Sequence, residues 1–132
     1  MLKEIACKTL TGRGRIDYLY ERELRLDNVS KTLGCWIINL NYEINYEKED
    51  VYLDGFYSIQ LWYAKDNDQS SSVYEEKINF HEKARMVYRN VSTISNEKVF
   101  KIFVNKYPNA VYMKLNEDNS ITLKIEGLYF ID

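Results

Sequence analysis

The sequence predicts an all-β fold: an antiparallel β-sandwich or a partly open barrel of about eight or nine strands. Three observations predict it. Apolar and polar residues alternate with period two along most of the chain. Short polar segments that suit turns separate the alternating runs. Few segments suit a helix, so most of the chain is expected to form strands with one face in a core and the other in water.

The strands can be placed in chain order from these runs. Two further segments are ambiguous: residues 2–10 suit either a helix or a strand, and 79–88 suit a short helix around His81 or a strand. Loops are expected at 43–50, 65–72, 90–96 and 116–120, and at 106–109, which holds the single proline. The expected strands are 15–26, 35–44, 57–63, 74–80, 100–105, 111–115 and 121–126.

The predicted core follows from the phase of each run. Trp36 shares a predicted strand face with Ile38 and Leu40, so we expect it to be buried, and Trp36→Ala to cost roughly 3–5 kcal/mol. The residues expected in the core are Trp36, Ile38, Leu40, Ile59, Leu61, Ile102, Val104, Leu123 and Ile125.

Length and composition bound the function. The 132 residues suffice for one domain, which we place at 1–132. The net charge of −2 argues against a nucleic-acid partner, which requires a basic surface. No apolar run approaches the roughly 20 residues of a membrane helix, so membrane insertion is not expected. The first residues lack the apolar stretch of a signal peptide, which favours a cytosolic protein.

Few residues suggest chemistry, and we expect no catalytic residue, no metal site and no cofactor. His81 is the single histidine, and a polar role at a strand end competes with a catalytic one. Cys7 and Cys35 fit reduced thiols, or crosslinks formed in an oxidising assembly. Residues 11–15 fit a flexible basic turn better than an anion-binding turn. Asp66 to Asp68 fit a solvated hairpin better than a calcium loop.

Aromatic residues are the compositional anomaly, with 12 tyrosines, 5 phenylalanines and 2 tryptophans. So many phenols cannot all be hidden, and exposed aromatics on a β domain suggest a protein interface or a platform for sugar rings. Trp62 faces away from the stripe that begins at Tyr57, so it is expected on the outer face. The residues hypothesised to form a protein interface are Phe56, Trp62, Tyr63 and Tyr74.

Two segments carry a resemblance to a known family. The first is Gly34-Cys35-Trp36-Ile37-Ile38-Asn39, and the second is Gly55-Phe56-Tyr57-Ser58-Ile59-Gln60-Leu61-Trp62-Tyr63. Their order, a Gly-x-Trp-x-Ile-Asn strand followed by a Gly-x-Tyr-x-Ile-x-x-Trp-Tyr strand, resembles the outer spore coat morphogenetic protein E (CotE) family. The resemblance extends from about Gly12 to Ile131.

The resemblance implies a non-enzymatic structural protein of the bacterial spore coat. Members of this family self-associate, recruit other spore coat proteins and scaffold the outer coat, without a cofactor. It implies synthesis in the mother-cell cytoplasm and a final location in the spore coat. The residues alone leave one alternative from another class, a carbohydrate-binding β-sandwich that uses exposed Trp and Tyr side chains. An enzyme built around His81 is a weaker third reading.

Overall fold

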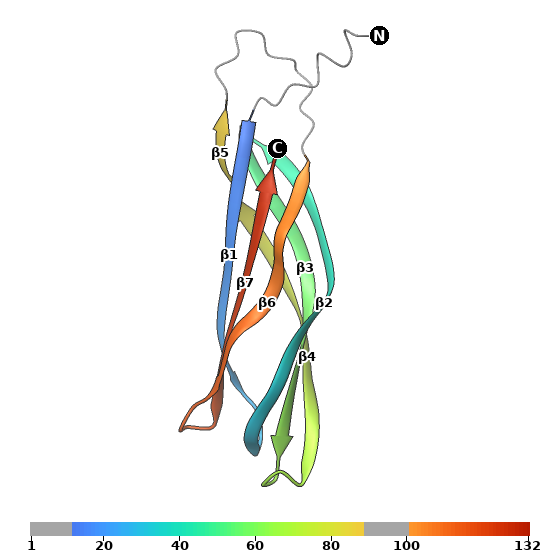
Figure 1. The fold of residues 1–132 in the computed structure, drawn as a ribbon, viewed down its shortest axis with the longest axis vertical. Helices are drawn as coiled ribbons and strands as arrows, with labels where there is room; N and C mark the ends of the chain where they lie inside the picture. The colour runs from blue at the N-terminus through green and yellow to red at the C-terminus, as the bar shows by residue number, and fades with distance from the viewer. Residues whose placement is uncertain (1–11, 89–100) are drawn as a thin grey trace.

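Long antiparallel strands make up nearly all of the structure. The computed structural model describes residues 12–88 and 101–132, and Figure 1 shows the strands running along the long axis of the molecule. Those residues contain no helix, and hence none long and apolar enough to cross a membrane. The strands are β1 (Gly12–Arg25), β2 (Val29–Glu47), β3 (Asp50–Lys65), β4 (Ser70–Lys83), β5 (Arg85–Tyr88), β6 (Ile102–Leu115) and β7 (Ser120–Ile131).

Two sheets pack face to face, which confirms the predicted all-β sandwich. One sheet has four strands in the order β5-β1-β7-β6, and the other has three in the order β2-β3-β4. All the pairs are antiparallel. The two sheets form an open sandwich, with β2 and β6 in contact along one side. The described chain has seven strands, fewer and longer than the eight or nine expected.

The turn predicted at residues 106–109 is wrong, so the two strands expected on either side of it form one strand. Pro108 lies inside β6, which runs unbroken from Ile102 to Leu115. Its pairing with β7 shifts register between Val104 and Lys106 and again between Lys106 and Asn109. An edge strand tolerates proline at such irregularities because one row of its amides needs no partner within the sheet.

The segment 79–88, left open as a helix or a strand, is strand. β4 ends at Lys83 and β5 begins at Arg85, so the chain passes from one sheet to the other at Ala84. The Ala84 amide donates to the carbonyl of Val51, and this bond holds the crossing point against β3. Two other predicted segments lie outside the described residues: 2–10, expected as a strand or a helix, and 90–96, expected as a loop.

The basic turn expected at residues 11–15 is also wrong for the part that can be described. Gly12 to Arg15 belong to β1 and pair with β5, and from Gly14 onward also with β7. A Cβ at Gly14 would meet the sulfur of Met86, so the flexible end of that side chain would have to move. Fixed in a three-strand pairing, this segment has no loop geometry with which to surround an anion.

The hairpins use residues that accept a left-handed backbone. Lys48 and Glu49 join β2 to β3 with φ values of 49° and 71°, so the loop predicted over 43–50 is a two-residue turn and its first half is strand. Asp66, Asn67 and Asp68 also have positive φ, in the predicted polar hairpin between β3 and β4.

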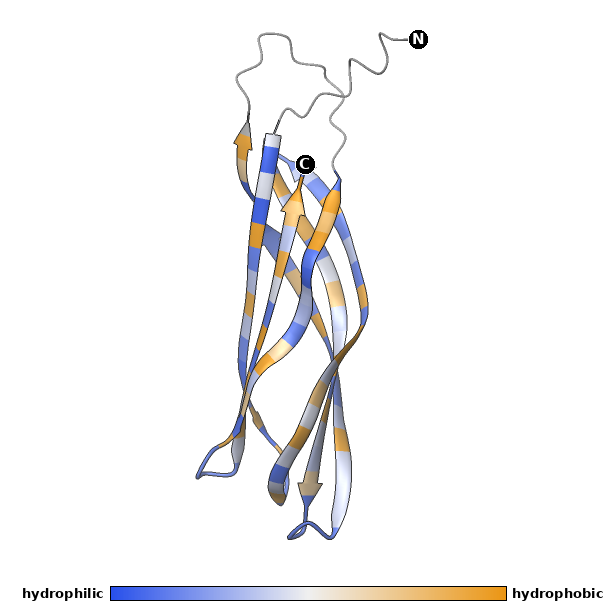
Figure 2. Ribbon diagram, viewed as in Figure 1, coloured by the Kyte–Doolittle hydropathy of each residue, from blue (hydrophilic) through white to orange (hydrophobic). Residues whose placement is uncertain are grey.

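The core lies between the two sheets, and Figure 2 shows hydrophobic and hydrophilic residues alternating along the strands. Of the nine predicted core residues, Ile59, Leu61, Leu123 and Ile125 are fully buried. Three others pack against the core while partly buried: Leu40, Ile102 and Val104. Ile38 is half-buried, and Trp36 is not in the core at all.

A bulge in β2 explains the error at Trp36. Ile38 pairs with Ser58 and Asn41 with Phe56, so β2 has one residue more than β3 over this stretch. Asn39 adopts a left-handed φ of 56°, which accommodates the extra residue. The bulge reverses the phase of the strand, so Ile37 packs against the core before it and Leu40 after it. A continuous period-two reading therefore assigns Trp36 to the wrong face.

Candidate functional site: the outer face of the three-stranded sheet

The outer face of β2-β3-β4 exposes both tryptophans. Residues directly opposite each other in antiparallel strands point to the same side of the sheet. Trp62 of β3 lies opposite Gly34 of β2 and Val73 of β4. The residues directly before and after it on β3, Leu61 and Tyr63, are buried, whereas Trp62 is 38% exposed. Trp62 therefore points away from the core.

Trp36 belongs to the same face and is the more exposed of the two, at 61%. It lies opposite Gln60, one outward-facing position along β3 from Trp62. Its ring extends over Gly34: a Cβ added to that glycine would lie 4.0 Å from ring carbon Cζ2. Because Gly34 has no side chain, the surface is low at the position that lies opposite Trp62 and beneath the edge of the Trp36 ring. Val73, 40% exposed, continues the apolar surface onto β4.

Phe56 lies farther along the same face, beyond Gln60 and Ser58 on β3. It is half-buried and lies between Asn41 and Asn79 on the neighbouring strands. The ammonium of Lys77 lies 4.0 Å from the centre of its ring, a cation–π contact that covers part of the phenyl surface. We define the aromatic outer face as Trp36, Phe56, Trp62 and Val73.

The four residues hypothesised as an interface do not share one side of the sheet. Phe56 and Trp62 lie on the aromatic outer face, but Tyr63 is only 9% exposed and belongs to the core. Tyr74 packs against the core from β4, opposite Leu61. Sequence reasoning missed Trp36 and Val73 as members of the face. Asn39 was the signal in the sequence that could have placed Trp36 on this face. Asparagine accepts the left-handed backbone of a bulge, and a bulge at Asn39 reverses the side of the sheet to which Trp36 is assigned.

His81 lies farther along the same outer face, in a polar cluster. Its ring stacks on Tyr52 at 4.5 Å between centroids, and its Nδ1 hydrogen-bonds to the carboxylate of Asp54. Asn45 also donates to Asp54. Burial would raise the pKa of Asp54, but these two hydrogen bonds outweigh it and lower the pKa. No three His, Cys, Asp or Glu residues in the described ranges are grouped so as to hold a metal ion.

Cys35 points to the interior side of β2, opposite Leu61, and packs against the core. Burial raises the pKa of its thiol to about 11. At neutral pH the thiolate that forms disulfides is therefore scarce, which disfavours Cys35 as a crosslinking residue. Cys7, the other cysteine, lies outside the described residues.

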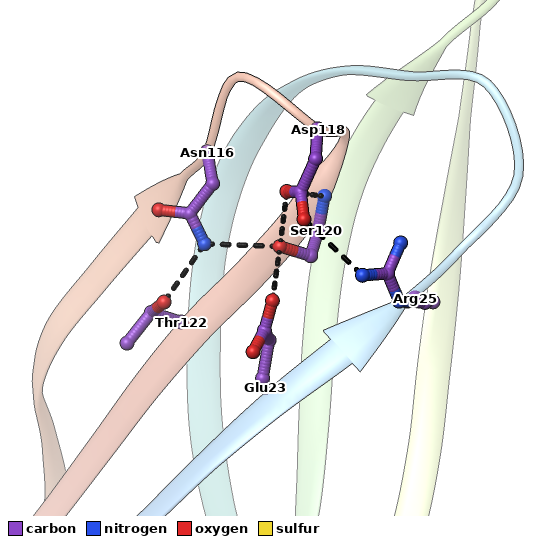
Figure 3. Close-up of polar contacts among 6 residues, drawn as sticks. All are labelled: Glu23, Arg25, Asn116, Asp118, Ser120 and Thr122. Carbon is purple, nitrogen blue, oxygen red and sulfur yellow. Dashed lines mark hydrogen bonds and ion pairs between the residues drawn. The ribbon is translucent and has the colours of Figure 1, made fainter.

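A polar cluster closes the β6–β7 hairpin and ties it to β1 (Figure 3). Its residues are Glu23, Arg25, Asn116, Asp118, Ser120 and Thr122. The buried hydroxyl of Ser120 accepts from Asn116 and lies 2.7 Å from a carboxylate oxygen of Glu23 and 2.6 Å from one of Asp118. Hydrogen bonds from Ser120 lower the pKa of Asp118, and Arg25 pairs with that carboxylate at 3.2 Å. These contacts are internal and fix the turn in place.

The Asp66–Asp68 turn is likewise engaged within the molecule. A carboxylate oxygen of Asp68 accepts from the Ser30 hydroxyl at 2.7 Å, and the other lies 3.7 Å from the ammonium of Lys31. The turn is a solvent-exposed hairpin, as expected from its polar sequence.

Comparison with known families decides what kind of protein carries this face. The sequence profile of the family described as outer spore coat protein E (CotE) matches residues 1–132. This chain belongs to the CotE family. The match extends over the whole sequence and confirms the resemblance of the two tryptophan strands. A role in the spore coat follows from membership, and the chain is assigned to sporulation.

No curated protein and no solved structure matches the chain significantly.

Proposed function

We propose that this CotE-family chain is a non-enzymatic scaffold that self-associates through its aromatic outer face and recruits other spore coat proteins. In this proposal it needs no cofactor, binds no nucleic acid and does not insert into membranes. It is made in the mother-cell cytoplasm and ends in the spore coat. The observation that carries the proposal is the exposure of two tryptophans on one sheet face, at 61% and 38%.

Tryptophan is costly to leave in water and is enriched in the energetic centres of protein interfaces. Trp36 and Trp62 lie one outward position apart, with Gly34 leaving the surface low between them and Val73 beside Trp62. A flat apolar area on a rigid sheet can be covered without rearranging the backbone, which keeps the entropic cost of association low. A second copy presents the same area, so the face can pair with itself in an isologous contact.

The polar residues around the aromatic outer face are engaged with one another. His81 is held by Asp54 and Tyr52, and Gln60 donates to Glu75 at 2.9 Å. Gln60 and Glu75 lie within the face, between Trp62 and Phe56 on β3 and beside them on β4, and their hydrogen bond leaves these two side chains with a partner when the face is covered. This arrangement supports association and gives the histidine a structural role.

Trp62→Glu tests the proposal. It places a carboxylate in the centre of the face and should lower the solution mass at equal concentration, with an unchanged circular dichroism spectrum. Leu19→Glu is the matched control, because Leu19 is 60% exposed on β1 of the other sheet. It should leave the mass unchanged. If the Trp62 variant keeps the wild-type mass, the aromatic outer face is not the interface.

The same face also suits the alternative of a carbohydrate-binding module, since sugar rings stack on exposed tryptophan. The two functions differ in what the wild-type protein does by itself. A carbohydrate module would be a monomer that is retained on an insoluble polysaccharide, with retention lost in Trp36→Ala. The scaffold is a larger assembly without any added glycan.

A further inference from the structure

The sheet edges of this sandwich differ in how they are protected. β2 and β6 lie against each other along one side. The pairing of β2 with β3 shifts register three times, and so does the pairing of β6 with β7, which also contains Pro108. Bulges and proline are two of the features that keep an edge strand from pairing with another chain. This side of the molecule is therefore blocked against strand addition.

β4, on the opposite side, has neither a bulge nor a proline, although it carries charged side chains. Its pairing with β3 continues from Ser70 to Lys83 without a register shift, and it contains no proline or glycine. Within 12–88 and 101–132, no strand pairs with its other edge. A long, regular edge with a free row of amides and carbonyls is a template for a further strand.

We propose that β4 pairs antiparallel with β4 of a second copy, about a two-fold axis centred on Glu76. This inference rests on the proposed self-association and names a contact distinct from the aromatic outer face. The pairing would join the three-stranded sheets of two molecules into one continuous sheet.

Symmetry restricts the register. A two-fold axis normal to the sheet places one residue of β4 opposite its own copy. The chain leaves this sheet at Ala84, so the paired stretch must lie within Ser70–Lys83. Only an axis at Glu76, which pairs residues 70–82, or at Lys77, which pairs 71–83, uses nearly the whole strand.

Charge selects between these two registers. An axis at Lys77 places two ammonium groups directly opposite each other on the outer face. An axis at Glu76 instead places Glu75 opposite Lys77 of the second copy, and Lys77 opposite its Glu75, which gives two favourable cross-strand pairs. It also places Tyr74 opposite Ile78 of the second copy on the inner side.

The negative charge of Glu76, the residue on the axis, is already compensated within its own molecule. Glu76 would face its own copy, and like charges directly opposite each other are unfavourable. Arg22 of β1 forms an ion pair with Glu76 from the other sheet. Its hydrogen bond also lowers the pKa of Glu76. The pairing therefore brings together two ion pairs and not two bare carboxylates.

Charge reversal tests both the contact and its register. Lys77→Glu turns both cross-strand pairs repulsive and should raise the dissociation constant of the β4 contact about tenfold. Glu75→Lys should do the same. The double variant Glu75→Lys/Lys77→Glu exchanges the two charges and should restore the wild-type constant. Both side chains are exposed, and circular dichroism checks that each variant folds.

One control separates association from the local contacts of these side chains. Lys77 covers Phe56 within its own molecule, so Lys77→Gln removes that contact without introducing repulsion. It should weaken association less than Lys77→Glu. Equal weakening by the two variants would place the effect at Phe56 and overturn the β4 pairing.

The measurement is the solution mass of each variant across a concentration series. If the wild type assembles, both single variants weaken the assembly and the double variant restores it, the β4 pairing is supported. If the wild type assembles and the charge variants match it, the β4 pairing is wrong while the proposed function stands. A wild type that is monomeric throughout overturns the proposed function, and the β4 pairing with it.

Discussion

The hydroxyl oxygens of Tyr18 and Tyr57 lie 2.6 Å apart inside the core. Tyr18 comes from β1 in one sheet and Tyr57 from β3 in the other, so a polar bond joins the two layers of the sandwich. Their rings meet edge to face, 5.9 Å apart. Each hydroxyl gives the other the partner that a buried phenol needs, which offsets the cost of burying these two polar groups.

Tyr57→Phe should destabilise the protein because it leaves the Tyr18 hydroxyl buried without a partner. The expected loss in the free energy of unfolding is about 1–3 kcal/mol, measured by urea denaturation. Tyr129→Phe is the matched control. The Tyr129 hydroxyl is buried and has no hydrogen-bond partner among the described residues. Its removal should be close to neutral, and equal losses in the two variants would contradict this difference.

Alkaline pH should unfold the protein through the same tyrosines. Burial raises the pKa of Tyr18 to about 12 from an ordinary value of 10.0, and it also raises the pKa of Tyr129. A pKa raised by folding means that the neutral phenol is favoured in the folded state. The contribution of these tyrosines to stability should therefore be constant below pH 10 and fall between pH 10 and about 12. Circular dichroism followed with tyrosinate absorbance measures this, and a fold unaffected at pH 12 would contradict it.

Trp36→Ala should barely change stability, contrary to the expectation from the sequence. The side chain is 61% exposed, and surface substitutions are usually within about 0.5 kcal/mol. Leu61→Ala, at a fully buried position of the neighbouring strand, should cost about 2–5 kcal/mol. Thermal or urea unfolding of both variants provides the comparison. A large loss for the Trp36 variant would restore this residue to the core.

Asn39 should be replaceable by glycine but not by valine. Its φ of 56° is readily adopted by glycine and costs a β-branched residue about 1–2 kcal/mol. Gly55→Ala should also destabilise, because a Cβ there would collide with the carbonyl oxygen of Asn41 just after the bulge. Unfolding free energies measure both effects. If Asn39→Val is as stable as Asn39→Gly, the bulge is not fixed by this residue.

The fold class was predictable because period-two alternation and polar hairpins are local signals. On β3, Tyr57, Ile59 and Leu61 are all fully buried, as their alternation predicts. Irregularities inside strands were not predictable from period alone. The extra residue at Asn39 reverses the face of Trp36, and Pro108 lies within a strand and not in a turn. Both depend on pairing with a neighbouring strand, which no short window of sequence contains.

The candidate site was predictable only in part for the same reason. Trp62 was placed correctly on the outer face because β3 has no register shift against β4 near it. Val73 was missed because its membership depends on the register that places it opposite Trp62. Which residues of β2, β3 and β4 become neighbours on this surface depends on the register of β2 with β3 and of β3 with β4. Period-two alternation specifies neither register.

The mass of the wild-type protein in solution tests self-association most directly. Light scattering should be measured across a concentration series on the purified chain, whose monomer mass is 15.8 kDa. Self-association predicts a mass that is a multiple of this value and rises with concentration as the aromatic outer face becomes occupied. A mass that stays at 15.8 kDa at every concentration would contradict it.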